Sequence, residues 1–445
     1  MDKSILIVSD LHLGAGEKIN GQRNPLEDFH FDERFADFLS FQTRQYPHHL
    51  ELIILGDAFD FPQVLPEIGF TCSTPKLGTT QEESMRRLEL IIQGHGVFFK
   101  ALRNFLLSGK NTARFIRGNH DIDLLWPNVQ DRLRREIMVG DNLIFDDDYI
   151  YRYKGLYCEH GNQYSVENAF PNPHHPVKTD PQGKARIERC WGTYFVDVVY
   201  NGIETRFPII DNVEDGQIIR GALMAIKSEK VHFTGRVVGQ MLKIAFRAGL
   251  PIMGWIGSGT LGEDDIDAIP ISELSSGHIV TAEDLLKNLR DQELSRGLLR
   301  KYKDDLDFRD QFDFEIAEVL QELAGTEVHL LPPKDINQTL GLVTGINAYQ
   351  RAAESILQKE KGTKVVVFGH THKPVDGTSI GTVNGSVIKY FNSGSWTICV
   401  DLDDVRNQGK NFDELCHSGI RKDSLDYVEV TVTSDKNVYA ALGTA

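Results

Sequence analysis

Five apolar segments of this chain stop abruptly at aspartate, histidine or asparagine, and this repeated pattern constrains the fold most. Each apolar run is as long as a buried β-strand. Ligands in an α/β sheet gather outside the carboxyl ends of the strands, so these polar side chains are expected to lie together. The segments are ILIVSD from residue 5, LIILGD from residue 52, RFIRGNHD from residue 114, LYCEHG from residue 156 and KVVVFGH from residue 364.

The first segment continues to Leu11 and His12 and leaves two interpretations open. Strand alternation would point Asp10 and His12 to the same side, because Leu11 takes the position between them. Two such side chains suit a metal site, and they also suit a capped turn. Asp28 and His30 have the same spacing without a strand before them, so the spacing alone does not decide.

The composition is that of a globular protein with a large core. The chain has 445 residues, 41% hydrophobic and 25% charged, so more than one compact unit is expected. The net charge of −16 disfavours nucleic acid and anionic membranes as general partners, although a local basic patch would survive it. Five scattered cysteines without a CxxC, and no visible secretory signal, favour a cytoplasmic location.

Strands alternate with helices in both terminal parts of the chain, whereas the middle is mainly helical. We therefore expect an α/β core in two parts, residues 1–167 and 358–445, around a helical insertion at 168–357. The insertion would leave and rejoin the core beside the polar strand ends, as a cap or lid. Its apolar stretch 237–256 is interrupted by charges, glycine and proline, which favours a buried or amphipathic helix over a membrane span. Peripheral contact with a membrane stays open.

One long helix is predicted in the first part of the core. Residues 82–109 keep a helical pattern of apolar residues and end near Gly109. His95 stands between two glycines in this segment, and we interpret it as a helix-break residue rather than as a functional one.

The residue types at the strand ends indicate which metals would fit. Histidine nitrogen with aspartate and asparagine oxygen suits Mn, Fe or Zn better than Ca or a thiolate-binding metal. A carboxylate that bridges two ions about 3.5–4 Å apart would hold both the attacking and the leaving oxygen of phosphoryl transfer. On an extended segment, His370 and His372 would lie on one side, so that each could reach one ion.

In order along the chain, the motifs D-x-H, G-D-x-x-D, G-N-H-D, a lone histidine and G-H-x-H resemble the calcineurin-like metallophosphoesterase superfamily. They lie within residues 5–162 and 364–396. The resemblance implies a four-layer α/β/β/α sandwich and a site with two divalent metal ions, with Mn expected and Fe or Zn as alternatives. The implied ligands are Asp10, His12, Asp57 and His372 for one ion, with Asp57 bridging, and Asn119, His160 and His370 for the other.

The resemblance also implies roles for two further residues. His120 would stabilise the phosphate or protonate the leaving oxygen, and Asp121 would orient its imidazole. For Asp60, a supporting or turn role and a direct role both stay open. Within the superfamily, GHTHKP followed by YFNSGSW is similar to the branch of UDP-2,3-diacylglucosamine pyrophosphatases. That lipid enzyme typically has Arg where His120 stands, and its insertion is much shorter.

The expected function is hydrolysis of a phosphodiester or pyrophosphate by a hydroxide that the metals activate. The expected partner is a small molecule, nucleotide-linked or lipid-linked. A nuclease of the DNA-repair type, a protein phosphatase and a non-catalytic scaffold are the alternatives. A nuclease would want a basic groove, which the acidic composition disfavours. A protein phosphatase would need an open site, which the insertion would cover. The oligomeric state stays open.

Overall fold

The structure is a computed structural model whose chain divides into two compact units. The first unit comprises Met1–Asp215, Leu342–Gln408 and Ser418–Ala445, and the second comprises Gly216–Gly341 and Gly409–His417. The predicted insertion boundaries at residues 168 and 357 stay a prediction. The structure describes residues 2–46, 49–65, 77–138, 140–165, 168–201, 204, 212, 235, 238–239, 281–287, 292–325, 346–383, 385–399, 422–423 and 425–445.

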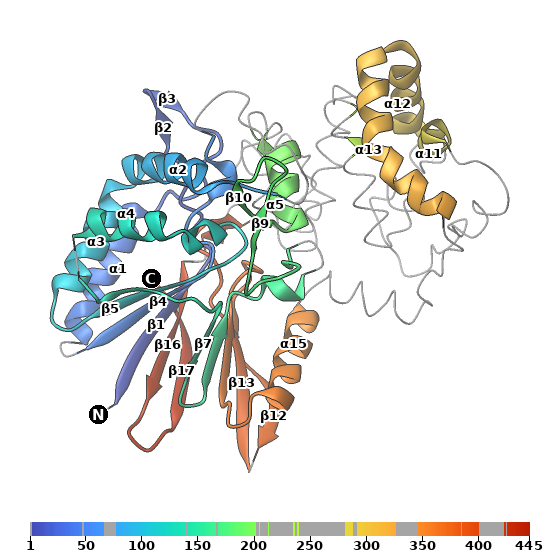
Figure 1. Cartoon of the computed structure of the whole chain (residues 1–445). Coiled ribbons are helices and arrows are strands. Elements are labelled where there is room, and N and C mark those ends of the chain that lie inside the picture. Colours follow the sequence, from blue (N-terminus) through green and yellow to red (C-terminus); the bar gives the residue numbers. More distant parts are fainter. Residues whose placement is uncertain are drawn as a thin grey trace. The chain divides into compact units, whose positions relative to one another are not determined.

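The first unit contains a six-stranded sheet in the order β17-β16-β1-β4-β5-β6 (Figure 1). Its strands from β1 to β6 run parallel, and β16 and β17 continue the sheet in antiparallel pairing. All of β4 and the second half of β1 are buried, because a parallel strand is covered on both faces. The bounds are β1 (Lys3–Val8), β4 (Leu50–Leu55), β5 (Thr112–Ile116), β6 (Leu143–Phe145), β16 (Asp426–Val432) and β17 (Val438–Thr444).

A five-stranded sheet in the order β12-β13-β11-β8-β7 belongs to the same unit. β8, β11 and β13 are parallel, and the two edge strands are antiparallel to their neighbours. Parallel strands occur in both sheets, so both sheets bring carboxyl ends of strands to the site described below. The bounds are β7 (Ile150–Tyr153), β8 (Leu156–Glu159), β11 (Val365–Phe368), β12 (Val375–Val383) and β13 (Ser386–Asn392).

Alternating side chains of β1 separate the two faces of the six-stranded sheet. Ile5 and Ile7 belong to an apolar cluster that joins this sheet to β8 and β11 of the other sheet. Leu6 and Val8 belong to a second cluster, which contains the buried faces of α1, α2, α3 and α4. The sheets therefore pack face to face, with these four helices on the outer face of the six-stranded sheet (Figure 1). The helices are α1 (Asp32–Gln45), α2 (Gln81–Gly94), α3 (Gly96–Leu107) and α4 (Pro127–Ile137).

Helix α15 (Ile346–Lys359) covers the outer face of the five-stranded sheet. Ala353 and Ile356 pack there against Val366 of β11 and Tyr390 of β13, all of them buried. The chain is thus a mixed α/β protein, and the predicted fold class is confirmed at this level.

The long helix predicted for residues 82–109 is wrong, because the structure has two helices, α2 and α3, that meet at His95. His95 has φ −123° and ψ 43°, which no α-helix accommodates. Its interpretation as a helix-break residue is confirmed.

The second unit contributes α11 (Ala282–Lys287), α12 (Gln292–Asp304) and α13 (Leu306–Gly325) within the described residues. Of the predicted apolar stretch 237–256, all except residues 238 and 239 lie outside the described residues. Over the part of the chain described here, no helix has both the length and the apolar character needed to cross a membrane. The remaining short elements are β2 (Lys18–Ile19), β3 (Gln22–Arg23), η1 (Phe61–Gln63), η2 (Ile122–Leu125), η3 (Asn162–Tyr164), β9 (Val177–Thr179), β10 (Ala185–Ile187), α5 (Trp191–Phe195), η4 (Val196–Tyr200), β14 (Ile398–Cys399) and β15 (Lys422–Asp423).

Candidate metal centre

The polar strand ends meet where the parallel strands of both sheets terminate. Asp10 follows β1 of the six-stranded sheet, and its backbone N–H donates to the carbonyl of Gly56 at 3.1 Å. His160 follows β8 of the five-stranded sheet, and its Nδ1 lies 2.9 Å from the carbonyl oxygen of Leu55 at the end of β4. The backbone N–H of Gly369, after β11, donates to the carbonyl of His160 at 2.9 Å. The predicted convergence of these segments is therefore observed.

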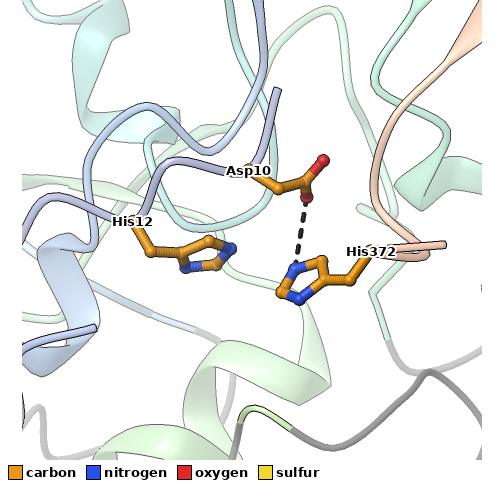
Figure 2. Close-up of side chains that lie close together, drawn as sticks. All are labelled: Asp10, His12 and His372. Carbon is orange, nitrogen blue, oxygen red and sulfur yellow. Dashed lines mark ion pairs between the residues drawn. The ribbon is translucent and has the colours of Figure 1, made fainter. Parts of the chain in front are cut away.

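Asp10, His12 and His372 form one group whose ligand atoms all lie within 4.8 Å of one another. Figure 2 shows Asp10 and His12 on one loop, facing His372 on another. Nε2 of His372 lies 3.4 Å from Oδ1 of Asp10, and the rings of the two histidines are 5.1 Å apart. The backbone N–H of His370 donates to Oδ2 of Asp10 at 2.9 Å, which ties the two loops together.

Asp57, His160 and His370 form a second group with the same spacing limit, and all three are buried. Nε2 of His160 lies 3.0 Å from Oδ2 of Asp57, and the His160 and His370 rings are 5.1 Å apart. The contact of His160 Nδ1 with a carbonyl places a proton on Nδ1, because a carbonyl oxygen only accepts. In neutral His160, the Nε2 lone pair therefore points at a carboxylate, an arrangement that a cation between them would stabilise.

Asp57 of the second group also faces the first group. The Oδ2 atom that contacts His160 is also 3.8 Å from Nε2 of His12 in the first group. Its other oxygen accepts the backbone N–H of His120 at 2.8 Å, which fixes the carboxylate. A Cβ on Gly118 would lie 2.1 Å from that oxygen, so the glycine of the G-N-H-D motif is required for this approach.

Five of the seven predicted ligands lie on left-handed backbone, not on strands. β1 ends at Val8, so the predicted strand alternation of Asp10 and His12 is wrong, as is the extended segment predicted for His370 and His372. A left-handed conformation is uncommon for residues with a side chain and costs of order 1–3 kcal/mol, and such residues cluster at functional sites. The φ angles are 53° for Asp10, 51° for His12, 51° for Asp57, 71° for His370 and 56° for His372.

Three buried polar atoms of the centre have no hydrogen-bond partner within the part of the chain described: Nε2 of His12, Nδ1 of His372 and Oδ1 of Asn119. Buried atoms of this kind are rarely left without a partner, because their desolvation is costly. Nδ1 of His12 lies 2.7 Å from a carboxylate oxygen of Asp60, so the proton sits on Nδ1 and a lone pair stays on Nε2. Lone pairs on nitrogen and amide oxygen, beside two carboxylates, fit a divalent metal ion. These groups can therefore hold metal.

The charges of the centre favour a cation. Burial raises the pKa of Asp10 and of Asp57, but attraction to His160 is among the effects that outweigh it, and both pKa values are lowered. Burial lowers the pKa of His160, yet attraction to Asp57 and Asp10 raises it to about 9, so His160 is protonated in the metal-free protein and an ion bound there would replace its Nε2 proton. Burial and the neighbouring His160 lower the pKa of His370 to about 3, so His370 is neutral. Ionised carboxylates and neutral imidazole are the forms that bind metal.

His120 lies beside the first group. Its Nδ1 is 3.0 Å from Asp60, whose carboxylate also contacts His12, and the ligand atoms of these three residues lie within 4.8 Å of one another. Burial raises the pKa of Asp60, but attraction to His120 and the hydrogen bond from His12 outweigh burial, so the pKa of Asp60 is lowered. Asp60 is therefore an ionised carboxylate that holds both imidazoles.

Asp121 is placed differently from its predicted role. Its two carboxylate oxygens accept the backbone N–H groups of Ala58 at 2.8 Å and Gly118 at 2.7 Å. Burial and the neighbouring Asp57 raise the pKa of Asp121 to about 7. Asp121 thus fastens the loops after β4 and β5, and Asp60, rather than Asp121, orients His120. The sequence prediction chose the adjacent carboxylate, whereas the turn points that side chain at backbone.

Asn168 is a site residue that sequence reasoning missed. Its Oδ1 accepts from Nδ2 of Asn119 at 3.5 Å, and its Nδ2 lies 3.4 Å from Nε2 of His370. Asn162 holds it in place by donating to its carbonyl at 2.8 Å. Asn168 therefore joins two predicted ligands. No motif surrounds it, so no sequence signal could have identified it.

Comparison with known proteins does not assign the chain. No protein-family model matches it, and no curated protein matches it. A functional assignment therefore depends on the geometry and chemistry of the centre.

Proposed function

We propose that this chain is a dinuclear-metal phosphohydrolase that cleaves a phosphodiester or pyrophosphate. The position of Asp57 carries the proposal, because its Oδ2 lies 3.0 Å from Nε2 of His160 and 3.8 Å from Nε2 of His12. One carboxylate oxygen thus faces an imidazole of each group, as a bridging ligand requires. Two packed sheets with helices on both outer faces support the four-layer α/β/β/α metallophosphoesterase arrangement.

In this proposal, each group of ligands holds one divalent ion, with Mn expected and Fe or Zn as alternatives. Such ions would lower the pKa of a water and stabilise charge on the phosphoryl oxygens. The residues that would hold them are Asp10, His12 and His372 on one side, Asn119, His160 and His370 on the other, and Asp57 between them.

His120 acts in this proposal as the residue that interacts with the phosphate or protonates the leaving oxygen. The ionised Asp60 contacts its Nδ1 and stabilises the doubly protonated imidazole, which then carries its second proton on Nε2. The carboxylate of Asp121 accepts two backbone hydrogen bonds and so holds the turn that carries Asn119 and His120.

The proposed substrate is a small molecule that contains a phosphodiester or pyrophosphate, nucleotide-linked or lipid-linked. The net charge of −16 disfavours a long polyanion such as nucleic acid. All but two residues of the apolar stretch of the insertion lie outside the described residues, so the stretch adds no support for a lipid-linked substrate.

The test is metal analysis combined with hydrolysis of bis-p-nitrophenyl phosphate. The chain is stripped with a chelator, dialysed and reloaded with Mn, Fe or Zn. We expect two ions per chain, hydrolysis only in the reloaded protein, and a spin-coupled signal in electron paramagnetic resonance with Mn. Failure of the wild-type chain to bind metal, or hydrolysis that survives its removal, would refute the proposal.

The chain offers a matched control for this test. His12→Ala removes the histidine of the first D-x-H, and His30→Ala removes that of the second. His30 is one-third exposed and contacts Glu17, away from either metal-binding group. We expect His12→Ala to lose metal and activity and His30→Ala to keep both. Equal behaviour of the two variants would contradict the assignment.

A further inference from the structure

The loop that carries Asp10 and His12, residues 9–16, is called the β1 loop here. On one side it is fastened to the loop after β4, since the backbone N–H groups of Leu11 and His12 both donate to the carbonyl of Asp57 at 2.9 Å. The N–H of Leu13 likewise donates to the carbonyl of Ala58 at 3.0 Å, and among the described residues no further backbone hydrogen bond joins the β1 loop from Gly14 onward to the loop after β4.

Glu27 supports the second half of the β1 loop. Its side chain is completely buried, and its carboxylate accepts the backbone N–H groups of Gly14 at 3.2 Å and Gly16 at 2.5 Å. It also accepts the N–H of Phe29 at 3.1 Å. Hydrogen bonds to an ionised acceptor are stronger than those between neutral groups, so one carboxylate fixes the path of the chain just beyond His12.

His95 connects Glu27 to the helices. Its Nε2 lies 3.2 Å from Glu27 and its Nδ1 lies 3.0 Å from Asp32, the first residue of α1, and the His95 side chain is 2% exposed. Burial lowers the pKa of His95, but the hydrogen bond to Asp32 and the close contact with Glu27 outweigh it and raise the pKa to about 9. A buried ion group of this kind contributes little net stability, because removing the charges from water is costly. We therefore interpret Glu27 and His95 as residues that position the β1 loop rather than as a source of net stability.

The break between α2 and α3 also brings backbone against the β1 loop. A Cβ on Gly94 would lie 2.5 Å from the carbonyl carbon of Ala15 and 2.6 Å from the backbone nitrogen of Gly16. A Cβ on Gly96, at the other side of His95, would have nothing within 4 Å. The residues at the helix break therefore affect the β1 loop in two ways. The backbone of Gly94 packs directly against the loop, and His95 contacts Glu27, which holds the loop.

We propose that Gly94, His95 and Glu27 form a brace that positions the β1 loop and thereby sets the metal affinity of Asp10 and His12. These are positioning residues, since none of them reaches the centre itself. The inference about metal affinity rests on the proposed function, whereas the inference that the brace holds the loop does not.

The first test compares Gly94→Ala with Gly96→Ala. Alanine favours a helix at either position, so propensity cannot explain a loss that is confined to one of them. We expect Gly94→Ala to speed amide hydrogen exchange at residues 11–16 of the metal-free protein and to weaken Mn binding by about tenfold or more. Gly96→Ala should change neither quantity.

The second test compares His95→Gln with Glu51→Gln. Glu51 is as deeply buried as His95, and its carboxylate is paired with Lys3 at 2.6 Å and with Arg114 at 3.0 Å. It lies at the end of β4 that is far from Asp57. Both variants should lower the melting temperature, but only His95→Gln should speed exchange in the β1 loop and weaken Mn binding. This control separates positioning of the loop from a general loss of stability.

The outcomes are distinguishable. Unchanged exchange in both Gly94→Ala and His95→Gln would overturn the brace, and faster exchange with unchanged Mn affinity would overturn its role in metal binding. A wild-type chain that binds no Mn would refute the proposed function, and hydrogen exchange alone would then decide whether the brace exists.

Discussion

The two groups of candidate ligands differ in their exposure to solvent. In the first group, the side chain of His372 is 15% exposed, and the neighbouring His120 is 14% exposed. In the second group, the side chains of His160 and Asp57 are only 1% and 2% exposed. Electrostatic interactions are stronger where water is excluded. We therefore expect the second group to anchor its ion tightly and the first group to exchange its ion and face the substrate.

The largest effect is expected at Asp57, the proposed bridge between the two groups. Asp57→Asn removes the negative charge that faces both His12 and His160, so both ions should be lost and turnover should fall to background. Metal content after gel filtration measures this directly. Asp60→Asn is the comparison, since it is a buried carboxylate at the same turn that contacts His12 and His120 instead. If Asp57→Asn retains two ions and near-normal turnover, the groups do not share a ligand.

The second effect concerns the exposed side of the centre. His120→Ala should lower the rate by about 10²–10⁴-fold and leave both ions in place, because general acid catalysis is worth that much. The loss should shrink for esters with good leaving groups, which need less protonation. Rates across a series of phenyl phosphodiesters measure this. An equal loss for every leaving group would indicate phosphate binding, and loss of metal would make His120 a ligand.

The third expected effect is a several-fold difference between the two groups in the rate at which each releases its ion. With excess chelator, one equivalent of Mn should leave several-fold faster than the other, because the first group contains the more exposed side chain, His372. His372→Gln should abolish the fast phase and His160→Gln the slow one. Metal remaining on the protein over time gives both phases. A single phase in the wild type would mean that the difference in burial has no consequence for the ions.

The smallest effect is on stability and concerns only the brace of the first group. His95 faces Glu27 and Asp32, and these raise its pKa from 6.5 to about 9. The stabilisation is therefore fully present below about pH 6.5 and is lost as pH rises through about 9. The gap in urea midpoint between wild type and His95→Leu should shrink over that interval. The gap for Glu51→Gln should stay constant, since the Glu51 pKa is lowered and the group stays ionised throughout. A constant gap for His95→Leu would contradict this charge assignment.

The sequence predicted which residues meet, because apolar runs that stop at polar residues identify strand ends. It did not predict their backbone conformation. Asp10 and His12 are left-handed because Leu11 and His12 both bond to the carbonyl of Asp57, a tertiary contact that no local pattern encodes. The pairing of Asp60 with His120 escaped prediction for the same reason. Adjacency in the chain favoured Asp121, whose side chain turns to backbone instead.

The helix break is a second case in which local pattern and fold disagree. Apolar spacing through residues 82–109 favours one continuous helix, whereas the glycines on either side of His95 indicate a break, and contacts with the β1 loop and with Glu27 fix the break there. The ligand roles, the metals and the reaction stay predictions, because they depend on chemistry that neither the sequence pattern nor the backbone determines by itself.

The hydrogen-bond partners of Asp10 determine when, during synthesis of the chain, the centre can form. Its carbonyl accepts the N–H of Trp396 at 3.0 Å and the hydroxyl of Ser395 at 3.2 Å, and its carboxylate accepts the N–H of His370. The farthest of these partners, Trp396, lies 386 positions after Asp10, so a growing chain exposes Asp10 and His12 long before it contains the residues that complete their surroundings. Contacts so distant in sequence form late, since the whole intervening loop must close first. If the centre binds metal as proposed, we therefore expect an ion to bind only to chains that have been synthesised past Trp396.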